Sequence, residues 1–460
     1  MEHVDLAIIG SGSGNSLVTP DFADKKVMVI ESGTFGGTCL NVGCIPTKML
    51  VYAADVARGV REAARYGVDA RIDGVRWRDL RDRVFGRIDP ISAGGLAYRS
   101  EGPQTGVIQG RARFVGPREL VVRDNGPQGQ ERRLTADQIV VAAGSRPHIP
   151  EVVAASGVRY YTSNEVMRLD ELPERMVILG GGFIAAEFAH VFSDLGVQVT
   201  VVIRGQRLLR HEDEEVSEAF TRFADTQWDV RRGVEIVAVH ESGSGVRVEL
   251  SDGSAVQAGV LLVAAGRRPN TEDLGLTAAG IQTHPDGRIV VDQYGRTGIP
   301  GVWALGDVSS PYQLKHVANH EARVVAHNLV HPDDLRRFDH RWVPSAVFTC
   351  PQIASVGATE QQLRADGTPY VVKVQQYGDT AYGWAMEDTV GFCKVLADPA
   401  EGHLLGVHIM GDQASTLIQP AIQAMSLGLT VEQLARGQYW IHPALSEVLE
   451  NAMIGVLAQM

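Results

Sequence analysis

The sequence has few cysteines and no long apolar run, and both shortages narrow the class of protein. Its 460 residues include four cysteines, too few for a fold that depends on disulfide bridges. No apolar stretch approaches the roughly 18 residues that a membrane-spanning helix requires, so a membrane is not an expected partner. The acidic start, Met1 to Asp5, does not resemble a signal peptide.

Basic residues are also in the minority. There are 43 lysines and arginines against 55 acidic residues, which gives a net charge of -12. Such a surface repels the phosphates of nucleic acid, so nucleic acid is not an expected partner. The length and the 44% hydrophobic content instead predict a globular protein of about two to four domains.

A glycine-rich turn follows the first predicted strand, Val4 to Ile9. The turn contains Gly10, Gly12 and Gly14, and the next predicted strand, Val27 to Ile30, ends at the carboxylate of Glu31. A strand, a glycine turn and a later acid are typical of a dinucleotide site, in which the backbone approaches the pyrophosphate and the acid binds ribose. Asn15 and Pro20 depart from this pattern, so we expect a shortened helix after the turn.

The same pattern returns about 170 residues later. A predicted strand, Met176 to Leu179, leads into Gly180, Gly182 and Ala185, and the next strand ends at Ile203. Arg204, Arg207 and Arg210 follow that strand in place of an acid. Guanidinium groups there favour a 2′-phosphate, so this site is predicted to prefer NADPH over NADH.

Two further apolar runs end in glycine, at Gly144 and Gly266, and each is followed by Arg and Pro. We interpret them as strands that leave a domain at a crossover, which places boundaries near residues 150 and 270. After Trp342 the pattern changes to short antiparallel strands, with helices near Ser415–Leu427 and Ala444–Ala458. The predicted fold is α/β, with two Rossmann-like dinucleotide-binding domains and a C-terminal α+β domain.

Two of the cysteines, Cys39 and Cys44, lie five positions apart. In a regular helix their Cα atoms would be ~8–9 Å apart, whereas a disulfide needs less than about 7 Å. Bonding would therefore require a distorted helix, which Gly43 permits. We predict a labile, redox-active pair; no second Cys or His pair has metal-ligand spacing, so no metal site is expected. Cys350 and Cys393 are expected to be buried small hydrophobic residues.

The stretch Gly36–Pro46, with both cysteines, resembles the class I flavoprotein disulfide reductases, such as glutathione reductase, dihydrolipoamide dehydrogenase and mercuric reductase. Thr297–Asp307 resembles the family's second FAD motif, and Val347–Pro351 resembles the start of its dimerisation domain. His442-Pro443, with Glu447 five residues later, also matches the family. The resemblance extends over the whole chain.

The resemblance implies FAD and NADPH as cofactors and a homodimer as the active form. It implies an FAD domain from residues 1–150 and 270–341, an NADPH domain at 151–269 and a dimerisation domain at 342–460. Catalysis would use Cys39 and Cys44, with Lys48 near the flavin, and His442 of the partner subunit as acid–base catalyst oriented by Glu447.

Motifs and resemblance together predict the cofactor-binding residues. For FAD these are Gly10, Gly12, Gly14, Glu31, Ser32, Gly37, Thr38, Lys48, Ala112, Gly144, Asp307, Leu314 and His316. For NADPH and its contact with the flavin they are Gly180, Gly182, Ile184, Ala185, Glu187, Arg204, Arg210 and Gly266.

The substrate rests on a finer resemblance. The residues around the two cysteines and the first glycine turn are most similar to the family members that reduce mycothione, so mycothione is the expected substrate. The alternatives are glutathione disulfide, a dihydrolipoamide dehydrogenase activity, or an NADPH–quinone oxidoreductase that does not need the dithiol. Thiol chemistry that needs reducing power, together with the start of the chain, predicts a cytoplasmic location.

Overall fold

The computed structural model describes residues 2–460, and its first part is a six-stranded sheet in the order β1-β2-β3-β4-β5-β15, with β1 also paired to β5. The strands are β1 (Glu2–Ile9), β2 (Val27–Glu31), β3 (Thr105–Gly116), β4 (Glu119–Asp124), β5 (Glu131–Val141) and β15 (Val302–Ala304). The two strands predicted at Val4 to Ile9 and at Val27 to Ile30 are thus confirmed. Alternate residues of β1 enter two different hydrophobic clusters, with Ala7 and Ile9 in one and Leu6 and Ile8 in the other, as expected of a strand buried on both faces.

The connection between β1 and β2 contains no α-helix. It consists of two 3-10 helices, η1 (Ser13–Leu17) and η2 (Pro20–Phe22). Pro20 lacks a backbone N–H and starts a new turn, while Asn15 is held by Arg99, whose Nε donates to the Asn15 side chain over 2.7 Å. The helical segment after the glycine turn is therefore only five residues long, shorter than the helix that such a motif normally precedes.

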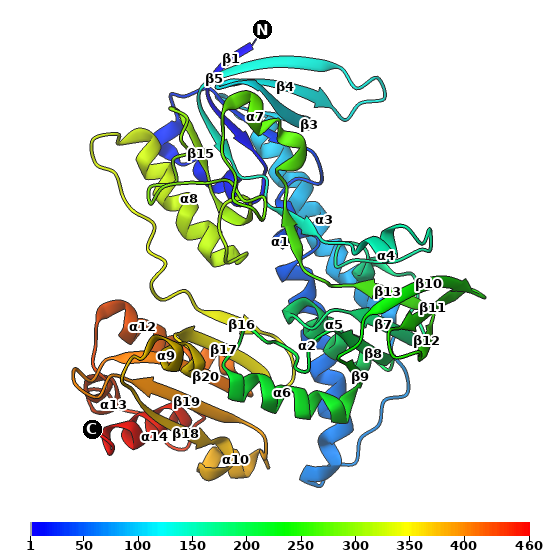
Figure 1. Ribbon diagram of the computed structural model, residues 1–460, viewed down its shortest axis with the longest axis vertical. Coiled ribbons are helices and arrows are strands. Elements are labelled where there is room, and N and C mark those ends of the chain that lie inside the picture. The colour runs from blue at the N-terminus through cyan, green and yellow to red at the C-terminus, as the bar shows by residue number, and fades with distance from the viewer. Residues whose placement is uncertain (1) are drawn as a thin grey trace.

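Long helices cover this first sheet and connect it to the rest. The helices of this part are α1 (Gly37–Asn41), α2 (Cys44–Glu62), η3 (Ala63–Tyr66), α3 (Trp77–Ser100), η5 (Glu272–Leu274), α7 (Leu276–Ala279), η6 (Gly306–Val308) and α8 (Lys315–Val330). From the end of α8 a long linker descends to the C-terminal sheet (Figure 1). Among residues 2–460, no helix combines the length and the apolar character that a membrane crossing needs.

The second sheet is parallel, in the order β13-β7-β8-β9, with a three-stranded antiparallel sheet, β10-β11-β12, beside it. The strands are β7 (Arg175–Leu179), β8 (Gln198–Ile203), β9 (Asp229–Arg232), β10 (Ile236–Ser242), β11 (Gly245–Leu250), β12 (Ala255–Ala258) and β13 (Val260–Val263). The helices are α4 (Glu151–Ala154), η4 (Val166–Arg168), α5 (Phe183–Asp194) and α6 (Glu214–Gln227). The chain enters and leaves this part through a short antiparallel pair, β6 (Ser145–Pro147) and β14 (Arg267–Pro269), which directly follow the two apolar runs that end at Gly144 and Gly266.

The C-terminal part is a five-stranded sheet in the order β16-β17-β20-β19-β18, antiparallel throughout. Its strands are β16 (Ser345–Val347), β17 (Gln352–Gly357), β18 (Val371–Gln376), β19 (Phe392–Ala397) and β20 (Leu404–Gly411). Its helices are α9 (Glu360–Asp366), η7 (Tyr377–Asp379), α10 (Ala381–Ala385), α11 (Ala414–Leu417), α12 (Gln419–Leu427), α13 (Val431–Arg436) and α14 (Ser446–Leu457). The helix expected near Ser415 is divided into α11 and α12, with a proline in the first turn of α12.

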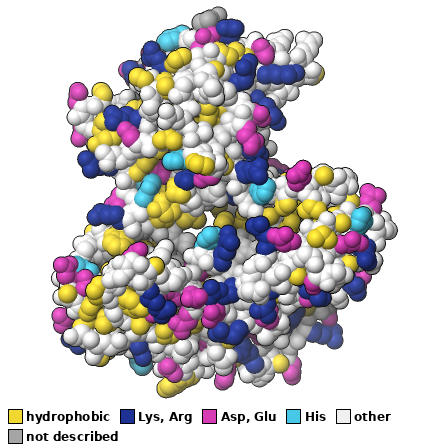
Figure 2. Space-filling model, in the orientation of Figure 1, with side chains coloured by type: hydrophobic (Ala, Val, Ile, Leu, Met, Phe, Trp, Pro, Cys, Tyr) yellow, Lys and Arg dark blue, Asp and Glu magenta, His cyan; other side chains and the backbone are white. Residues whose placement is uncertain are grey.

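The three parts form an upper lobe and a broader lower body (Figure 1). The first sheet fills the upper lobe, and the second and C-terminal sheets lie side by side below it. In the space-filling view the surface narrows between the lobe and the body, and acidic and basic side chains are interspersed over the face shown (Figure 2). The observed fold is the predicted α/β arrangement with an α+β C-terminal part.

Candidate active site

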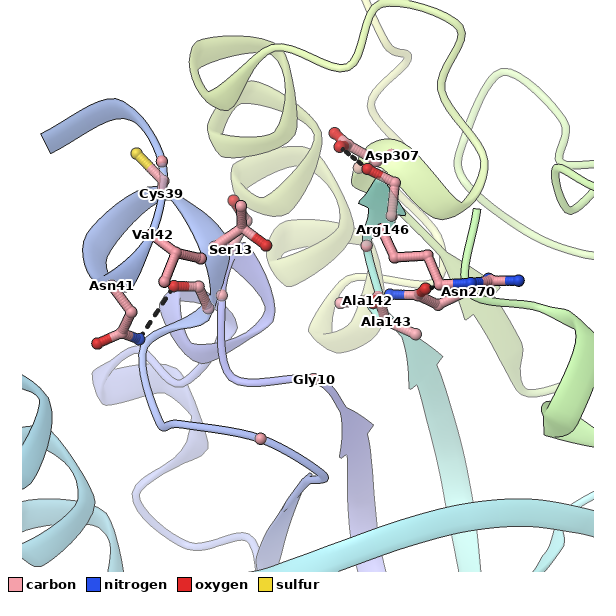
Figure 3. Close-up of a pocket in the computed structure, with 18 of the residues that line it drawn as sticks. Gly10, Ser13, Cys39, Asn41, Val42, Ala142, Ala143, Arg146, Asn270 and Asp307 are labelled. Atoms are coloured by element: carbon pink, nitrogen blue, oxygen red, sulfur yellow. Dashed lines mark hydrogen bonds between the residues drawn. The ribbon is translucent and has the colours of Figure 1, made fainter. Parts of the chain in front are cut away.

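A cavity of about 780 Å³ opens at the carboxyl ends of β1 and β2, and both cysteines of the predicted pair line it. Figure 3 shows part of this lining, with Cys39 on one side and Asp307 on the other. This volume lies within the range of small-molecule and cofactor sites. Segments far apart in the sequence line it, including Gly10–Ser13, Gly36–Cys39, Ala142–Arg146 and Gly306–Asp307. The carboxyl edge of a parallel sheet is the usual ligand site of such folds.

The glycine turn after β1 has no room for side chains. Gly10 has φ +106°, and a Cβ there would lie 2.3 Å from the carbonyl oxygen of Ala142. A Cβ on Gly37 would lie 2.6 Å from the Cα of Gly12. The two loops therefore meet backbone to backbone at the cavity wall, which suits the close approach of a dinucleotide pyrophosphate.

Glu31 lies at the end of β2, where the sequence predicts a ribose-binding acid. One of its carboxylate oxygens accepts from the backbone N–H of Ser11 over 2.9 Å and from the Ser11 hydroxyl over 2.6 Å. Its other oxygen accepts from the N–H of Gly33 over 2.7 Å. Glu31 thus ties the glycine turn to the second strand and lines the cavity.

The two cysteines belong to different helices. Cys39 lies in α1, which ends at Asn41, and Cys44 is the first residue of α2. Gly43 occupies the break, and a Cβ on it would lie 2.9 Å from the carbonyl oxygen of Thr38 and 3.3 Å from the Cα of Cys39. The predicted distortion is present, and it brings the two thiols, both free, into hydrogen-bonding contact.

The contact between the thiols makes them chemically unequal. The hydrogen bond from Cys39 lowers the pKa of Cys44 to about 7; burial opposes this shift, and the Lys48 ammonium assists it. The same contact, together with burial, raises the pKa of Cys39 well above its ordinary value. When both sulfurs are reduced, Cys44 therefore holds the thiolate and Cys39 holds the proton.

Lys48 and Glu187 form an ion pair on the wall of the same cavity. The Lys48 Nζ lies 2.6 and 2.7 Å from the two carboxylate oxygens of Glu187, which is 3% exposed. The N–H of Phe348 donates to Glu187 over 3.0 Å, and the Lys48 ammonium lies 4.5 Å from the centroid of the Phe348 ring. The pair therefore joins α2, α5 and the start of the C-terminal sheet.

A buried histidine connects the same two helices further along. The ring nitrogens of His190, on α5, lie 2.8 Å from Asp55 of α2 and 2.8 Å from Asp194 of α5. Burial lowers the pKa of His190, but its hydrogen bonds to Asp194 and Asp55 outweigh burial and raise it overall. The α2–α5 spacing is thus held by a polar contact within a largely apolar interface.

The second glycine turn lies at the carboxyl edge of the second sheet. Gly180 has φ +133°, and a Cβ on it would lie 2.2 Å from the carbonyl oxygen of Ala264. The Arg204 side chain is 77% exposed and lies 4.0 Å from the carboxylate of Glu235. Arg210 is exposed as well. Arg207 is different, because its guanidinium pairs with Glu214 and Glu218 over 2.7 and 2.9 Å. Arg204 and Arg210 are therefore the arginines available to a phosphate.

The His442–Glu447 pair is formed as the sequence predicts. The Nδ1 of His442 lies 2.6 Å from a Glu447 carboxylate oxygen, and the N–H of Ala444 donates to the other oxygen over 3.1 Å. The hydrogen bond to His442 lowers the pKa of Glu447. His442 is 71% exposed at its side chain and does not line the cavity that holds the dithiol of its own chain.

The cavity brings together most of the residues predicted for FAD. Those that line it are Gly10, Gly12, Glu31, Ser32, Gly37, Thr38, Lys48, Ala112, Gly144 and Asp307, together with Ile184 and Glu187 from the second set. Those that do not line it are Gly14, Leu314, His316, Gly180, Gly182, Ala185, Arg204, Arg210 and Gly266. The Nε2 of His316 instead lies 2.8 Å from the carbonyl oxygen of Pro344 in the linker.

Several polar residues of the cavity were not predicted from the sequence. The Ser145 hydroxyl donates to Asp307 over 2.6 Å, and the half-buried Arg267 donates to Ser145 over 2.8 Å. Lys315, the first residue of α8, donates to the hydroxyl of Ser13 over 2.8 Å. The Arg-Pro segments containing Arg146 and Arg267 were visible as strand ends, but no local pattern marked them as cavity residues.

The two other cysteines differ from each other. Cys393 is fully buried, as predicted, and burial alone raises its pKa above its ordinary value. Cys350 is only partly buried, which differs from the prediction, because it lies in the loop between β16 and β17 and not in a strand. Neither lines the dithiol cavity.

The residues that line the cavity fit FAD for two reasons. The two glycine loops leave space for a pyrophosphate, and the dithiol and the Lys48–Glu187 ion pair lie on the same wall. The family described as pyridine nucleotide-disulphide oxidoreductase matches residues 4–322, and its dimerisation domain matches residues 343–453. The chain belongs to this family. It is an FAD-dependent and NAD(P)H-dependent disulfide oxidoreductase that carries the family's dimerisation domain.

Individual relatives agree with this assignment. Mycothione reductase of Mycobacterium tuberculosis is 57% identical to this chain, covering 99% of the chain and 100% of that protein. Mercuric reductase of Streptomyces lividans is 36% identical, covering 96% of this chain and 93% of its own. Among solved structures, the HOCl-induced flavoprotein disulfide reductase RclA of Escherichia coli matches with a TM-score of 0.87 at 27% identity, covering 99% of this chain and 100% of that chain, in a Cu(II) complex.

Proposed function

We propose that this enzyme reduces mycothione to mycothiol with NADPH, through the Cys39–Cys44 pair. The observation that carries the proposal is the helix break at Gly43, which holds two unequal thiols together on the wall of a dinucleotide cavity. The similarity to mycothione reductase of M. tuberculosis supports the substrate. Arg204 and Arg210 support NADPH as the coenzyme.

The side chains of this chain supply the thiol chemistry. Bound FAD would be held by the cavity residues named above, and it would pass two electrons from NADPH to the Cys39–Cys44 disulfide. Cys39, as a thiolate, then attacks one sulfur of the substrate, whose S–S bond breaks as a mixed disulfide forms. The Cys44 thiolate attacks Cys39, which re-forms the Cys39–Cys44 disulfide and releases the second thiol. One NADPH and one proton are consumed for each disulfide converted to two thiols.

A base is needed because Cys39 holds the proton of the reduced pair. We assign this role to His442 of the partner subunit, which takes the proton from Cys39 and returns it to the first leaving thiolate. The exposure of His442, its separation from the dithiol cavity of its own chain and the dimerisation domain support this assignment. Glu447 holds the Nδ1 proton, so that Nε2 faces the reacting sulfur.

The domain assignment follows the three sheets. Residues 1–150 and 270–341 form the FAD domain, because β15 returns to the sheet of β1 and β5. Residues 151–269 form the NADPH domain, and residues 342–460 form the dimerisation domain. Because the reaction generates thiols with NADPH, we place the enzyme in the reducing cytoplasm.

A single variant tests the thiol route. In Cys39→Ser, we expect NADPH oxidation with mycothione to be lost while NADPH still reduces a quinone. Disulfide turnover at the wild-type rate in this variant would contradict the proposal. Parallel assays of the wild-type enzyme with mycothione, glutathione disulfide and lipoamide identify the substrate, and a preference for either of the other two would overturn the mycothione assignment.

A further inference from the structure

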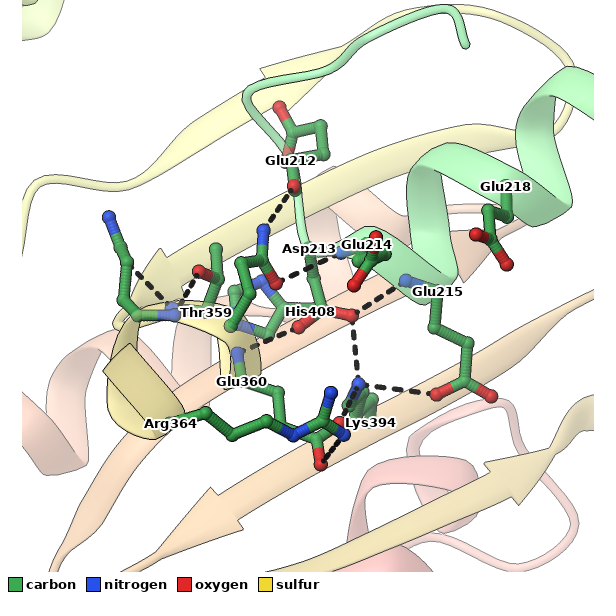
Figure 4. A network of polar contacts seen from close by, with 12 residues as sticks. Glu212, Asp213, Glu214, Glu215, Glu218, Thr359, Glu360, Arg364, Lys394 and His408 are labelled. Carbon is green, nitrogen blue, oxygen red and sulfur yellow. Dashed lines mark hydrogen bonds and ion pairs between the residues drawn. The ribbon is translucent and has the colours of Figure 1, made fainter. Parts of the chain in front are cut away.

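The loop that carries Arg204 and Arg210 ends at a buried cluster of charged residues on the C-terminal sheet (Figure 4). This arginine loop, residues 204–213, runs from the end of β8 to the start of α6. Its last residue, Asp213, is 0% exposed and accepts from the N–H of Glu215 to cap α6. The Nζ of Lys394, on β19, lies 2.8 Å from Asp213 and is itself nearly fully buried.

Lys394 is surrounded by three carboxylates. Besides Asp213, its Nζ lies 2.6 Å from Glu360 at the start of α9 and 3.2 Å from Glu215. Burial by itself would raise the pKa of Asp213, but the hydrogen bond from Lys394, the N–H of Glu360 and the nearby positive charges together outweigh burial and lower it. Without the ammonium, the three acidic groups would repel one another at the start of α6.

The C-terminal sheet presents a row of polar side chains to this loop. Lys394 is directly opposite His408, and His408 is directly opposite Ser355, on three adjacent strands. Residues in direct register project from the same face of a sheet. The hydroxyl of Ser355 donates to the Glu212 carboxylate, and the Gln361 side-chain amide donates to the Glu212 carbonyl oxygen over 3.0 Å. Both residues at the end of the arginine loop are therefore held by the C-terminal sheet.

The same loop is also bonded to the second glycine turn. The N–H of Leu209 donates to the carbonyl oxygen of Gly181 over 2.7 Å, and the N–H of Glu212 donates to the carbonyl oxygen of Leu209 over 2.9 Å. Leu209 has φ +52°, a left-handed conformation that its surroundings must maintain. Arg210 follows Leu209 directly, so a displacement of Glu212 and Asp213 would change the backbone path that sets the position of Arg210.

We propose that Lys394 of the C-terminal domain is a positioning residue for the coenzyme, because it fixes the loop that presents Arg204 and Arg210 to the 2′-phosphate. The inference rests on the proposed use of NADPH. It makes the C-terminal domain a contributor to coenzyme selection, in addition to its part in dimerisation. Lys394 does not touch the coenzyme and acts through Asp213.

The test is Lys394→Met, which removes the charge and keeps most of the side-chain length. Rapid mixing with NADPH or NADH under anaerobic conditions gives the rate of flavin reduction at each coenzyme concentration. We expect the apparent dissociation constant for NADPH to rise about five-fold or more, with the limiting rate changed by less than about two-fold. The dissociation constant for NADH should stay within about two-fold, since NADH has no 2′-phosphate.

Equal changes in the dissociation constants for NADPH and NADH, or no change in either, would overturn the proposal. A lysine with a merely structural role would not discriminate between the two coenzymes. The matched control is Lys373→Met on the adjacent strand β18. Lys373 is opposite Val395, the neighbour of Lys394 in β19, so its side chain lies on the other face of the sheet. We expect this variant to keep the wild-type coenzyme constants.

A milder variant covers the case in which Lys394→Met does not fold. Ser355→Ala removes one hydrogen bond to Glu212 and leaves Lys394 and its three carboxylates in place, so it should shift the apparent dissociation constant for NADPH in the same direction by a smaller factor. An unchanged ratio of NADPH to NADH constants in this variant would also overturn the proposal. A wild-type preference for NADH would instead contradict the proposed coenzyme, so the two failures are distinguishable.

Discussion

The inequality of the two thiols is the most direct property to test by mutation. The largest cause of the low pKa of Cys44 is the hydrogen bond from the Cys39 thiol. Cys39→Ala removes that donor and leaves Cys44, Lys48 and the helix start in place. We expect the pKa of Cys44 to rise to its ordinary value of 9.0 or above, because burial then acts against the thiolate with less opposition.

The expected change is large enough to measure. With a pKa of about 7, about half of the Cys44 side chains are thiolate at neutral pH. With the ordinary value of 9.0, the thiolate is ~1% of the population. Because only the thiolate is alkylated, the rate of alkylation at neutral pH should fall by a factor of ~50.

The assay is the pH dependence of alkylation by iodoacetamide under anaerobic conditions, with the modified cysteine located by peptide mass spectrometry. The reduced wild-type enzyme should give a midpoint near 7 at Cys44, and Cys39→Ala a midpoint about two units higher. Lys48→Met is the comparison variant. Since the Lys48 charge is a smaller cause than the Cys39 hydrogen bond, its midpoint should lie between those two.

Two results would refute this account of the dithiol. The first is an unchanged Cys44 midpoint in Cys39→Ala, which would mean that the Cys39 thiol does not stabilise the thiolate. The second is a larger shift in Lys48→Met than in Cys39→Ala, which would make the ammonium the main cause.

Three further predictions concern other parts of the site. Gly43→Ala should lower kcat for disulfide reduction at least ~10-fold in steady-state assays while quinone reduction persists, because the new Cβ would lie 2.9 Å from the Thr38 carbonyl oxygen; equal loss of both activities would point to misfolding instead. His442→Ala should lower kcat with mycothione by ~10²–10⁴ and leave flavin reduction by NADPH unchanged in rapid mixing. Near-normal turnover would mean that His442 has a structural role and does not act as acid–base catalyst. Arg204→Glu should raise KM for NADPH about ten-fold without a matching change for NADH, and unchanged NADPH kinetics would remove Arg204 from the coenzyme site.

Features that depend on short stretches of sequence were predictable. Gly10 and Gly180 follow apolar strands directly, and the structure allows no side chain at either position. The break at Gly43 follows from the spacing of the cysteines and the reach of a disulfide. In each case the requirement is local, because a few adjacent residues must adopt one backbone path.

Features that depend on distant residues were not predictable in this way. Asn15 was an unexplained departure from the glycine motif, and its partner Arg99 lies 84 positions later. The contact of Lys394 with Asp213 spans 181 positions. Lys315 reaches Ser13 across 302 positions, and no pattern near Lys315 indicates which loop it meets.

The imidazole of His190 has a consequence for how this enzyme can diversify. Together with the Lys48–Glu187 ion pair, it links the helix that begins with Cys44 to the helix that carries Glu187. Cys44 lies on the first helix and Glu187 on the second, and both line the same cavity. We therefore expect a mutation that changes the spacing of these helices to disturb both coenzyme oxidation and thiol release. We therefore expect substitutions that alter substrate choice alone to lie outside this helix pair.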